Sequence, residues 1–236
     1  MMVKKMPAGA IDFHAHILPG MDHGSRDLSE AIVQWRLLSD LGVARVVATP
    51  HFYAQDEPSV DDFVARRDAA AQALRNAVSG TMRLSLGAEV LLFRGLDRME
   101  GLDRLCIEGT NAILLEMPLG GFDSAEVETV ERIAALGLCP VIAHIDRYLV
   151  DTLALLLGND SVRFQVNAGA FLGLSRRAAC LRRMAEDGVI AAIGSDLHGT
   201  DRRALRGFAR AMARLGAGAD MIFKRTATLL DGAAVC

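Results

Sequence analysis

Short apolar runs recur along this chain and are almost continuous, without the alternation of a half-exposed strand. Such runs are typical of strands buried on both faces of a parallel sheet. Segments with helical spacing separate them, so the pattern predicts repeated strand–helix units. The expected strands are 10–13, 44–48, 84–88, 112–115, 140–143, 162–166 and 189–194.

The segments between these runs predict helices with recognisable ends. In the first, Leu28, Ile32, Trp35 and Leu38 recur at helical spacing. Either Asp27 or Ser29 would begin this helix, and Gly42 would end it. The expected helices are 28–41, 60–78, 124–136, 150–157, 175–187, 202–215 and one near 219–230.

Seven such units without a Pro/Ser-rich linker indicate one α/β domain that spans residues 1–236. A TIM-like barrel of seven strands fits best, because closure leaves no exposed parallel edge. An open doubly wound sheet is the alternative, since periodicity does not report closure. The absence of a Gly-rich dinucleotide fingerprint after the first strand weakens that alternative.

Composition excludes several classes of protein. With 26 Lys+Arg against 29 Asp+Glu, the chain lacks the basic excess of a nucleic-acid binder. Its four cysteines lie far apart and form no CxxC pair, which argues against a zinc ribbon, a thioredoxin-type motif or a dense disulfide framework. No signal peptide and no apolar run of membrane-spanning length are evident, so we expect a cytoplasmic protein.

All six histidines lie at or just after the carboxyl end of an expected strand, and so do three acidic residues. In parallel α/β folds this is the end where ligand and catalytic groups converge. Each residue alone is more often a hydrogen-bonded loop or capping residue than a ligand. The coincidence at nine positions favours a metal site. The nine residues are His14, His16, His23, His51, Glu89, Glu116, His144, Asp196 and His198.

Two of these motifs have direct geometric content. In His14-Ala15-His16 and Asp196-Leu197-His198, the two polar side chains lie on the same side of an extended chain. Imidazole and carboxylate ligands without thiolates suit Zn, Mn or Fe. The set is too large for one ion, and carboxylates can bridge ions about 3.5–4 Å apart. We therefore expect two or three divalent ions, with manganese favoured over iron or zinc.

Two polar positions near the motifs allow more than one role. His23 follows Asp22 in a loop, and either could bind metal, support a ligand or belong to a turn. We favour His23. Asn167 ends the sixth strand and could contact substrate or serve a turn, so it is left out of the expected site.

The ordered motifs resemble those of a known superfamily: DFHAHILPGMDHG, ATPHF, LGAE, ILLEMP, VIAHIDRY, QVNAGAFLG and IGSDLHG. They are similar to the PHP (polymerase and histidinol phosphatase) superfamily. Within it they resemble bacterial metal-dependent protein-tyrosine phosphatases encoded with capsule and exopolysaccharide genes. The resemblance covers about residues 11–203.

The resemblance implies a distorted seven-stranded barrel with three metal ions held by the nine residues above. It also implies phosphate-binding roles for Arg147 and Arg203, with Arg202 as a near neighbour that could replace Arg203. Two departures stand out. His23 occupies a position where the phosphatases usually have aspartate, and HIDRY replaces HPERY around Arg147.

The implied reaction is hydrolysis of a phosphate monoester. Metal ions would provide hydroxide at neutral pH and clamp the phosphoryl oxygens, while the arginines would bind the phosphate. The cysteine-nucleophile route needs an arginine six positions after the cysteine. That route is excluded, because Ala112, Ile145 and Glu186 follow Cys106, Cys139 and Cys180 at this spacing.

The expected substrate, by resemblance, is phosphotyrosine in a protein, namely the tail of a bacterial tyrosine autokinase. A small-molecule phosphatase, such as one acting on histidinol phosphate, would use similar ligands. A C–N hydrolase is disfavoured because Arg147 and Arg203 suit phosphate. A non-catalytic regulatory module would be expected to lose ligands, yet every position is filled by a competent residue.

Overall fold

The computed structural model describes residues 6–118, 121–148 and 150–232 of the 236-residue chain. Within them every strand pairing is parallel. The strands are β1 (Ile11–His16), β2 (Arg45–Ala48), β3 (His51–Phe52), β4 (Arg83–Leu86), β5 (Glu89–Leu91), β6 (Ala112–Glu116), β7 (Cys139–Ile142), β8 (Arg163–Asn167), β9 (Ile190–Gly194) and β10 (Leu197–His198).

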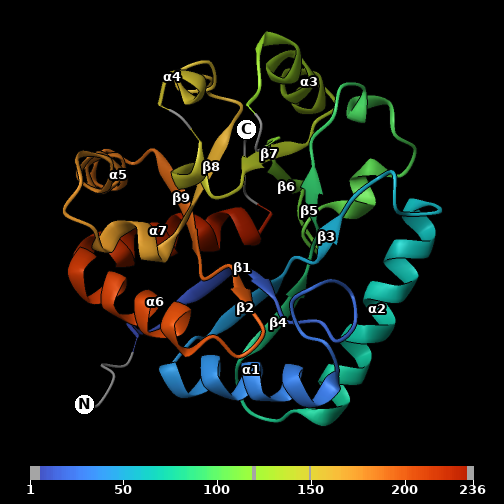
Figure 1. Cartoon of the computed structure of the whole chain (residues 1–236), viewed down its shortest axis with the longest axis vertical. Coiled ribbons are helices and arrows are strands. Elements are labelled where there is room, and N and C mark those ends of the chain that lie inside the picture. The colour runs from blue at the N-terminus through green and yellow to red at the C-terminus, as the bar shows by residue number, and fades with distance from the viewer. Residues whose placement is uncertain (1–5, 119–120, 149, 233–236) are drawn as a thin grey trace.

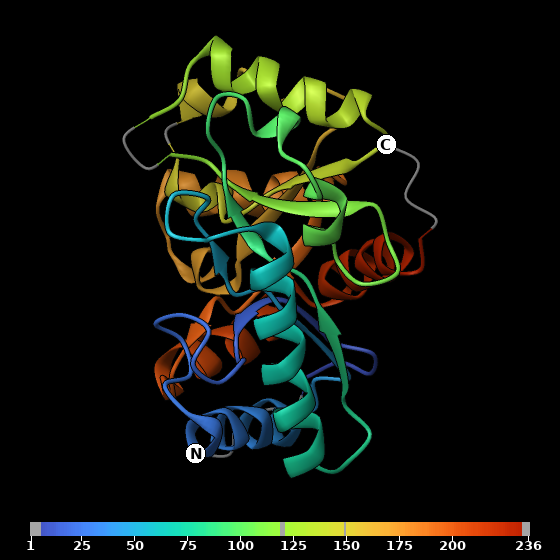
Figure 2. The same ribbon diagram turned by 90° about the vertical axis from the view of Figure 1, so that its right-hand side faces the viewer.

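Helices surround the strands, as the repeated units predict (Figure 1). The α-helices are α1 (Leu28–Leu41), α2 (Val60–Ala77), α3 (Ser124–Ala135), α4 (Val150–Leu153), α5 (Arg176–Glu186), α6 (Arg202–Leu215) and α7 (Ala217–Leu230). Short 3-10 helices are η1 (Leu96–Arg98), η2 (Leu102–Leu105), η3 (Ile145–Arg147) and η4 (Ala168–Leu172). Helix α7 packs against β9 and β1, on the opposite side of the strands from the loop between β1 and α1 (Figure 2).

The strands form two parallel sheets. One has the order β10-β1-β2-β4, and the other has the order β3-β5-β6-β7-β8-β9. Gly87, between β4 and β5, and Asp196, between β9 and β10, lie where the chain passes from one sheet to the other, and both donate hydrogen bonds to the four-stranded sheet. Gly87 N–H donates to Ala48 O at 2.9 Å, and Asp196 N–H donates to His14 O at 2.8 Å. A parallel α/β fold is confirmed, whereas the ladders of the described residues do not by themselves close into one ring.

The seven expected strands are all present with ends shifted by a few residues, and three short strands join them. The strand expected at 84–88 ends earlier: β4 ends at Leu86, and β5 begins in the other sheet at Glu89. Gly87 lies at this break, where a Cβ would lie 3.1 Å from Ile107 Cγ1. A residue without a side chain permits the close approach at which the chain changes sheets.

Helix ends follow local capping chemistry. Asp27 caps α1, since its side chain accepts the Glu30 N–H at 2.9 Å, and Gly42 ends the helix with φ of 91°. The structure thus selects Asp27 over Ser29. The helix expected at 150–157 is wrong in extent, because α4 ends at Leu153. Leu155 is 50% exposed, so the leucine-rich segment does not bury a continuous helical face.

No described helix combines the length and the hydropathy required to cross a membrane.

Candidate metal centre

Strand β1 supplies the innermost part of the candidate site. Asp12, His14 and His16 are fully buried, and because strand side chains alternate, they point to one side. The Nε2 atoms of His14 and His16 face each other at 3.1 Å. The two imidazoles therefore present their outer nitrogens to the same small volume.

Glu89, the first residue of β5, lies at the centre of the cluster. Its Oε2 atom is 3.1 Å from His14 Nε2, 3.2 Å from His16 Nε2 and 3.1 Å from His51 Nδ1. Its other oxygen, Oε1, is 2.7 Å from His144 Nε2. One buried carboxylate thus contacts four imidazoles from three separate segments of the chain.

Glu116 ends β6 and extends the cluster on one side. Its Oε2 atom lies 3.9 Å from His51 Nδ1, and its Oε1 atom lies 3.6 Å from His144 Nε2. His51 is the first residue of β3, which pairs with β5 so that His51 lies opposite Glu89. The short strand β3 therefore sets the position of this histidine.

Asp196 and His198 extend the cluster on the other side. Asp196 Oδ1 lies 3.5 Å from His16 Nε2 and 3.7 Å from His14 Nε2. The ring of His198 stacks on that of His16 with centroids 4.0 Å apart. Asp196 has a φ of 52°, and His144 has a φ of 30°. These are the described non-glycine residues with positive φ, a conformation that concentrates at functional sites.

His23 lies at the outer edge of the cluster and is exposed. Its ring stacks on His198 and His51, with centroids 4.4 and 4.9 Å apart. Asp22 points inward instead. Its Oδ2 atom lies 2.6 Å from His16 Nδ1 and accepts the His51 N–H at 3.0 Å. Asp22 therefore orients two histidines, a supporting role of the kind left open in the sequence.

The expected phosphate-binding arginines differ in their placement. Arg147, at the end of η3, donates from Nη2 to Asp196 Oδ2 and keeps 40% of its side chain exposed. Arg203 lies in the first turn of α6, exposed, and its side chain makes no hydrogen bond or ion pair with the described residues. The structure brings Arg147 to the cluster and does not bring Arg203 into contact with it.

A surrounding layer of polar side chains was not identified from the sequence. Gln165 Oε1 lies 3.4 Å from His14 Nδ1 and also accepts the His144 N–H. Asp12 accepts hydrogen bonds from the backbone N–H and the hydroxyl of Ser195, at 2.7 and 2.6 Å. Such partners fix the rotation and the tautomer of ligating groups. The alternation of side chains in β1 and β8 could have identified these residues from the sequence, because it places Asp12 on the same side as His14, and Gln165 on the same side as Asn167.

Asn167, which the sequence left between two roles, takes part in this layer. Its Nδ2 donates to Asp196 Oδ2 at 2.9 Å, and its backbone N–H donates to Asp146 Oδ1 at 2.9 Å. Tyr148 supports His144. Its hydroxyl accepts the Met117 N–H at 3.0 Å and lies 3.3 Å from His144 Nδ1.

The charges of the cluster depend on one another. Burial opposes protonation of His14, but the Glu89 and Asp196 carboxylates raise its pKa above the usual range. Burial raises the pKa of Glu116 to about 7, and the neighbouring Glu89 charge adds to this. Burial lowers the pKa of His51 to about 4. Desolvated carboxylates and imidazoles at this density need either shared protons or cations.

The donor set fits divalent metal ions. Three groups have ligand atoms within 4.8 Å of one another: His16–His51–His198, His14–His16–Glu89 and His51–Glu89–Glu116. Three buried atoms of the cluster have no hydrogen-bond partner among the described residues, namely His51 Nδ1, Glu89 Oε2 and His198 Nε2. Nitrogen and oxygen donors of this kind suit Mn, Fe or Zn. A metal-binding capacity follows from this donor set.

Comparison with known proteins agrees with this geometry. Residues 10–219 match the family described as capsular polysaccharide synthesis, CpsB/CapC. The chain belongs to the CpsB/CapC family. This membership confirms the resemblance drawn from the motifs.

Named members of the family share part of this sequence. Tyrosine-protein phosphatase YwqE of Bacillus subtilis (strain 168) is 27% identical over 205 residues, which cover 82% of this chain and 79% of YwqE. Tyrosine-protein phosphatase CpsB of Streptococcus pneumoniae is 30% identical over 148 residues, which cover 58% of this chain and 57% of CpsB.

A solved structure from work on YwqE of Bacillus subtilis and CpsB of Streptococcus pneumoniae shares the fold. It superposes with a TM-score of 0.76 at 22% identity, covering 94% of this chain and 95% of that one. Those two proteins are described as unique metal-dependent tyrosine phosphatases.

Proposed function

We propose that this CpsB/CapC chain is a metal-dependent phosphatase that hydrolyses phosphotyrosine in proteins and acts in capsule or exopolysaccharide synthesis. The observation that carries the proposal is the convergence on Glu89, whose Oε2 lies within 3.2 Å of ring nitrogens from His14, His16 and His51. The names of the related proteins and the metal dependence described for YwqE and CpsB support it.

Two or three divalent ions would be held by the expected ligands, with manganese as the first candidate and iron or zinc as alternatives. These ions would supply Lewis acidity toward the phosphoryl oxygens and acidify a water molecule. The proposed ligands are His14, His16, His23, His51, Glu89, Glu116, His144, Asp196 and His198.

The chain's own part in the reaction is to bind and orient the phosphate. The Arg147 guanidinium, half-exposed at the edge of the cluster, can present a fork of N–H donors to two phosphoryl oxygens. Its contact with Asp196 keeps that fork near the site before substrate arrives. We assign Arg203 a second contact with the phosphate, made from the first turn of α6 when the substrate is bound.

The proposed physiological substrate is the phosphorylated tail of a bacterial tyrosine autokinase, and the proposed location is the cytoplasm. A protein substrate is consistent with an exposed Arg147 and an exposed His23, since both are accessible from outside the cluster. Histidinol phosphate is the comparison substrate that separates this proposal from a small-molecule phosphatase.

We also propose that residues 1–236 form one catalytic domain in which the two sheets act as a distorted barrel of seven main strands. The packing of β1, in the four-stranded sheet, against β9, in the six-stranded sheet, supports this interpretation. The donors of the cluster come from both sheets, which a barrel would hold in fixed relation.

The test begins with metal analysis of the purified protein, followed by rates on a phosphotyrosine peptide and on histidinol phosphate with added Mn, Zn, Fe or Mg. We expect rapid hydrolysis of the peptide, slow hydrolysis of histidinol phosphate and complete loss of activity with a chelator. The H14A/H16A double variant should be inactive, and Q72A, on the exposed face of α2, should match the wild type. Undiminished turnover by H14A/H16A would refute the proposal.

A further inference from the structure

Helix α6 carries a row of exposed arginines. Arg202, Arg206, Arg210 and Arg214 recur every four residues, so they form one stripe along the helix. Their side chains make no ion pair or hydrogen bond with any residue in the described part of the chain. Exposed arginines elsewhere do pair: Arg26 with Glu30, and Arg94 with Glu126 and Asp123.

The stripe is unfavourable for the isolated protein. Like charges four residues apart repel each other on a helix, and positive charge at a helix amino terminus opposes the helix dipole. Asp201 caps the amino terminus of α6, but the helix itself contains no acidic residue to compensate the stripe along its length. The chain as a whole has a net charge of -3, so this concentration of positive charge is local. An external anionic group would relieve the repulsion.

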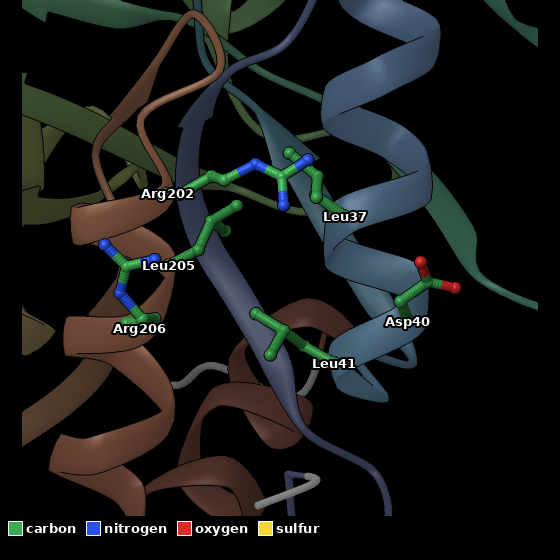
Figure 3. A pocket seen from close by; sticks show the side chains of 6 residues that line it. All are labelled: Leu37, Asp40, Leu41, Arg202, Leu205 and Arg206. Carbon is green, nitrogen blue, oxygen red and sulfur yellow. The ribbon is translucent and has the colours of Figure 1, made fainter. Parts of the chain in front are cut away.

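A hollow beside the stripe has an apolar lining. It lies between α1 and α6 and has a volume of about 230 Å³. Leu37 and Leu41 of α1 and Leu205 of α6 line it, and Arg202 reaches across from α6 toward Leu37 (Figure 3). Asp40 of α1 also lines it, with its carboxylate directed away from Arg202 and Arg206 (Figure 3). Small-molecule sites usually occupy roughly 300–1,000 Å³, so this volume suits one or two side chains of a peptide better than a separate ligand.

The hollow and the stripe begin close to the metal centre in the fold. Helix α6 starts four residues after His198, and Gln34 of α1 donates its Nε2–H to Gly199 O in the intervening loop. Four extended residues span at most about 14 Å. A peptide whose phosphotyrosine occupies the metal centre can therefore place its neighbouring residues on α6.

We propose that the α1–α6 groove, defined by Leu37, Leu41, Leu205, Arg202 and Arg206, together with Arg210 and Arg214, binds an acidic segment with apolar residues beside the target phosphotyrosine. Glutamate or aspartate side chains would pair with the arginines, and an apolar side chain would enter the hollow.

This assignment rests on the proposed function and names its substrate class more closely. An anionic membrane fits less well, because the exposed face of α6 has no large apolar residue to insert and the leucines are recessed between the helices.

The experiment compares two synthetic phosphotyrosine peptides, one flanked on both sides by alternating glutamate and leucine and one by alternating lysine and leucine. The variant is R206E/R210E, which leaves Arg202 and Arg203 intact near the site. The control for charge reversal outside the groove is K224E on α7, which changes the net charge by half as much as the double variant. A small aryl phosphate measures the chemistry alone.

For the wild type we expect a KM at least tenfold lower for the acidic peptide than for the basic one. In R206E/R210E this preference should disappear or reverse, with kcat and the aryl phosphate rate unchanged, and K224E should behave as the wild type. Equal KM values for both peptides in the wild type would overturn the proposal, as would an equal loss of rate on the aryl phosphate.

Two further measurements separate the remaining outcomes. Fluorescence anisotropy with the unphosphorylated acidic peptide tests binding without catalysis, and weaker binding by R206E/R210E supports the groove even if the proposed phosphatase function fails. Flotation with phosphatidylserine vesicles tests whether the arginine stripe binds an anionic membrane instead of a peptide. Vesicle binding that depends on Arg206 and Arg210, without any peptide preference, would overturn the assignment in favour of a membrane surface.

Discussion

At the scale of single residues, the metal centre depends on backbone approaches that only glycine allows. Gly194 ends β9 beside His14, where an added Cβ would lie 2.4 Å from His14 Cβ and 2.9 Å from Gln165 Nε2. Both neighbours are buried and held by the cluster, so neither can move away easily.

Replacing Gly194 by alanine should destabilise the protein by about 1–3 kcal/mol, or more, because the added methyl overpacks a rigid region. The measurement is urea unfolding of metal-free protein. The control is G169A in η4, where nothing lies within 4 Å of the added Cβ and the change should stay within about 0.5 kcal/mol. Equal stability of G194A and G169A would show that the close approach of Gly194 to His14 does not limit the residue type at this position.

The roles of Asp22 and His23 can be separated by metal stoichiometry. Asp22 lies 2.6 Å from His16 Nδ1, so D22N should keep the full number of bound ions but lower their affinity by roughly 10–100-fold. His23 is proposed as a direct ligand at the outer edge, so H23A should lose part of the bound metal outright. Metal analysis after equilibrium dialysis measures both. A full complement in H23A, with a reduced one in D22N, would reverse the assignment.

At the scale of elements, the side chain that caps helix α1 determines where the helix begins. Asp27 accepts the Glu30 N–H, whereas Ser29 lies inside the first turn. D27A should therefore cost about 0.5–2 kcal/mol in the free energy of unfolding. S29A should change it by less than about 0.5 kcal/mol. Thermal or urea unfolding measures both variants, and a larger loss for S29A would contradict the observed cap.

Elements with a continuous apolar pattern could be predicted from the sequence. The bounds of α1 and α6 agree with the structure, and the seven main strands lie where the apolar runs predict them. Strands β3 and β10 could not be predicted, because two residues have no periodicity and their pairing depends on partners far along the chain. The extent of α4 was wrong because apolar content does not reveal whether a face is buried.

The same distinction applies to the candidate site. Strand-end histidines and carboxylates could be found, because parallel strands bring their carboxyl ends together. The contact between Gln165 and His14 joins residues 151 positions apart, and no local pattern reports it. Arg203 is the opposite case. The resemblance implied that it binds phosphate, but in the structure its side chain does not contact the cluster.

At the scale of the whole molecule, the candidate metal centre takes its donors from both sheets. His14, His16 and His198 belong to the four-stranded sheet, and His51, Glu89 and Glu116 belong to the six-stranded sheet. Ions held between these donors would link the sheets, since two of the three candidate groups, His16–His51–His198 and His14–His16–Glu89, have members in both. Binding to the folded chain alone stabilises it in proportion to the logarithm of metal concentration.

Manganese at 100 times its dissociation constant should therefore stabilise the fold by about 2.7 kcal/mol. For a chain of this size that corresponds to a rise in Tm of roughly 5–11 °C. Calorimetric scans with manganese and with chelator measure the shift. The two sheets should still unfold in one transition, because the bound ions connect them. In H14A/H16A the shift should vanish, since Glu89 loses two of its partners. A manganese-dependent rise that persists in this variant would place the stabilising ion elsewhere in the molecule.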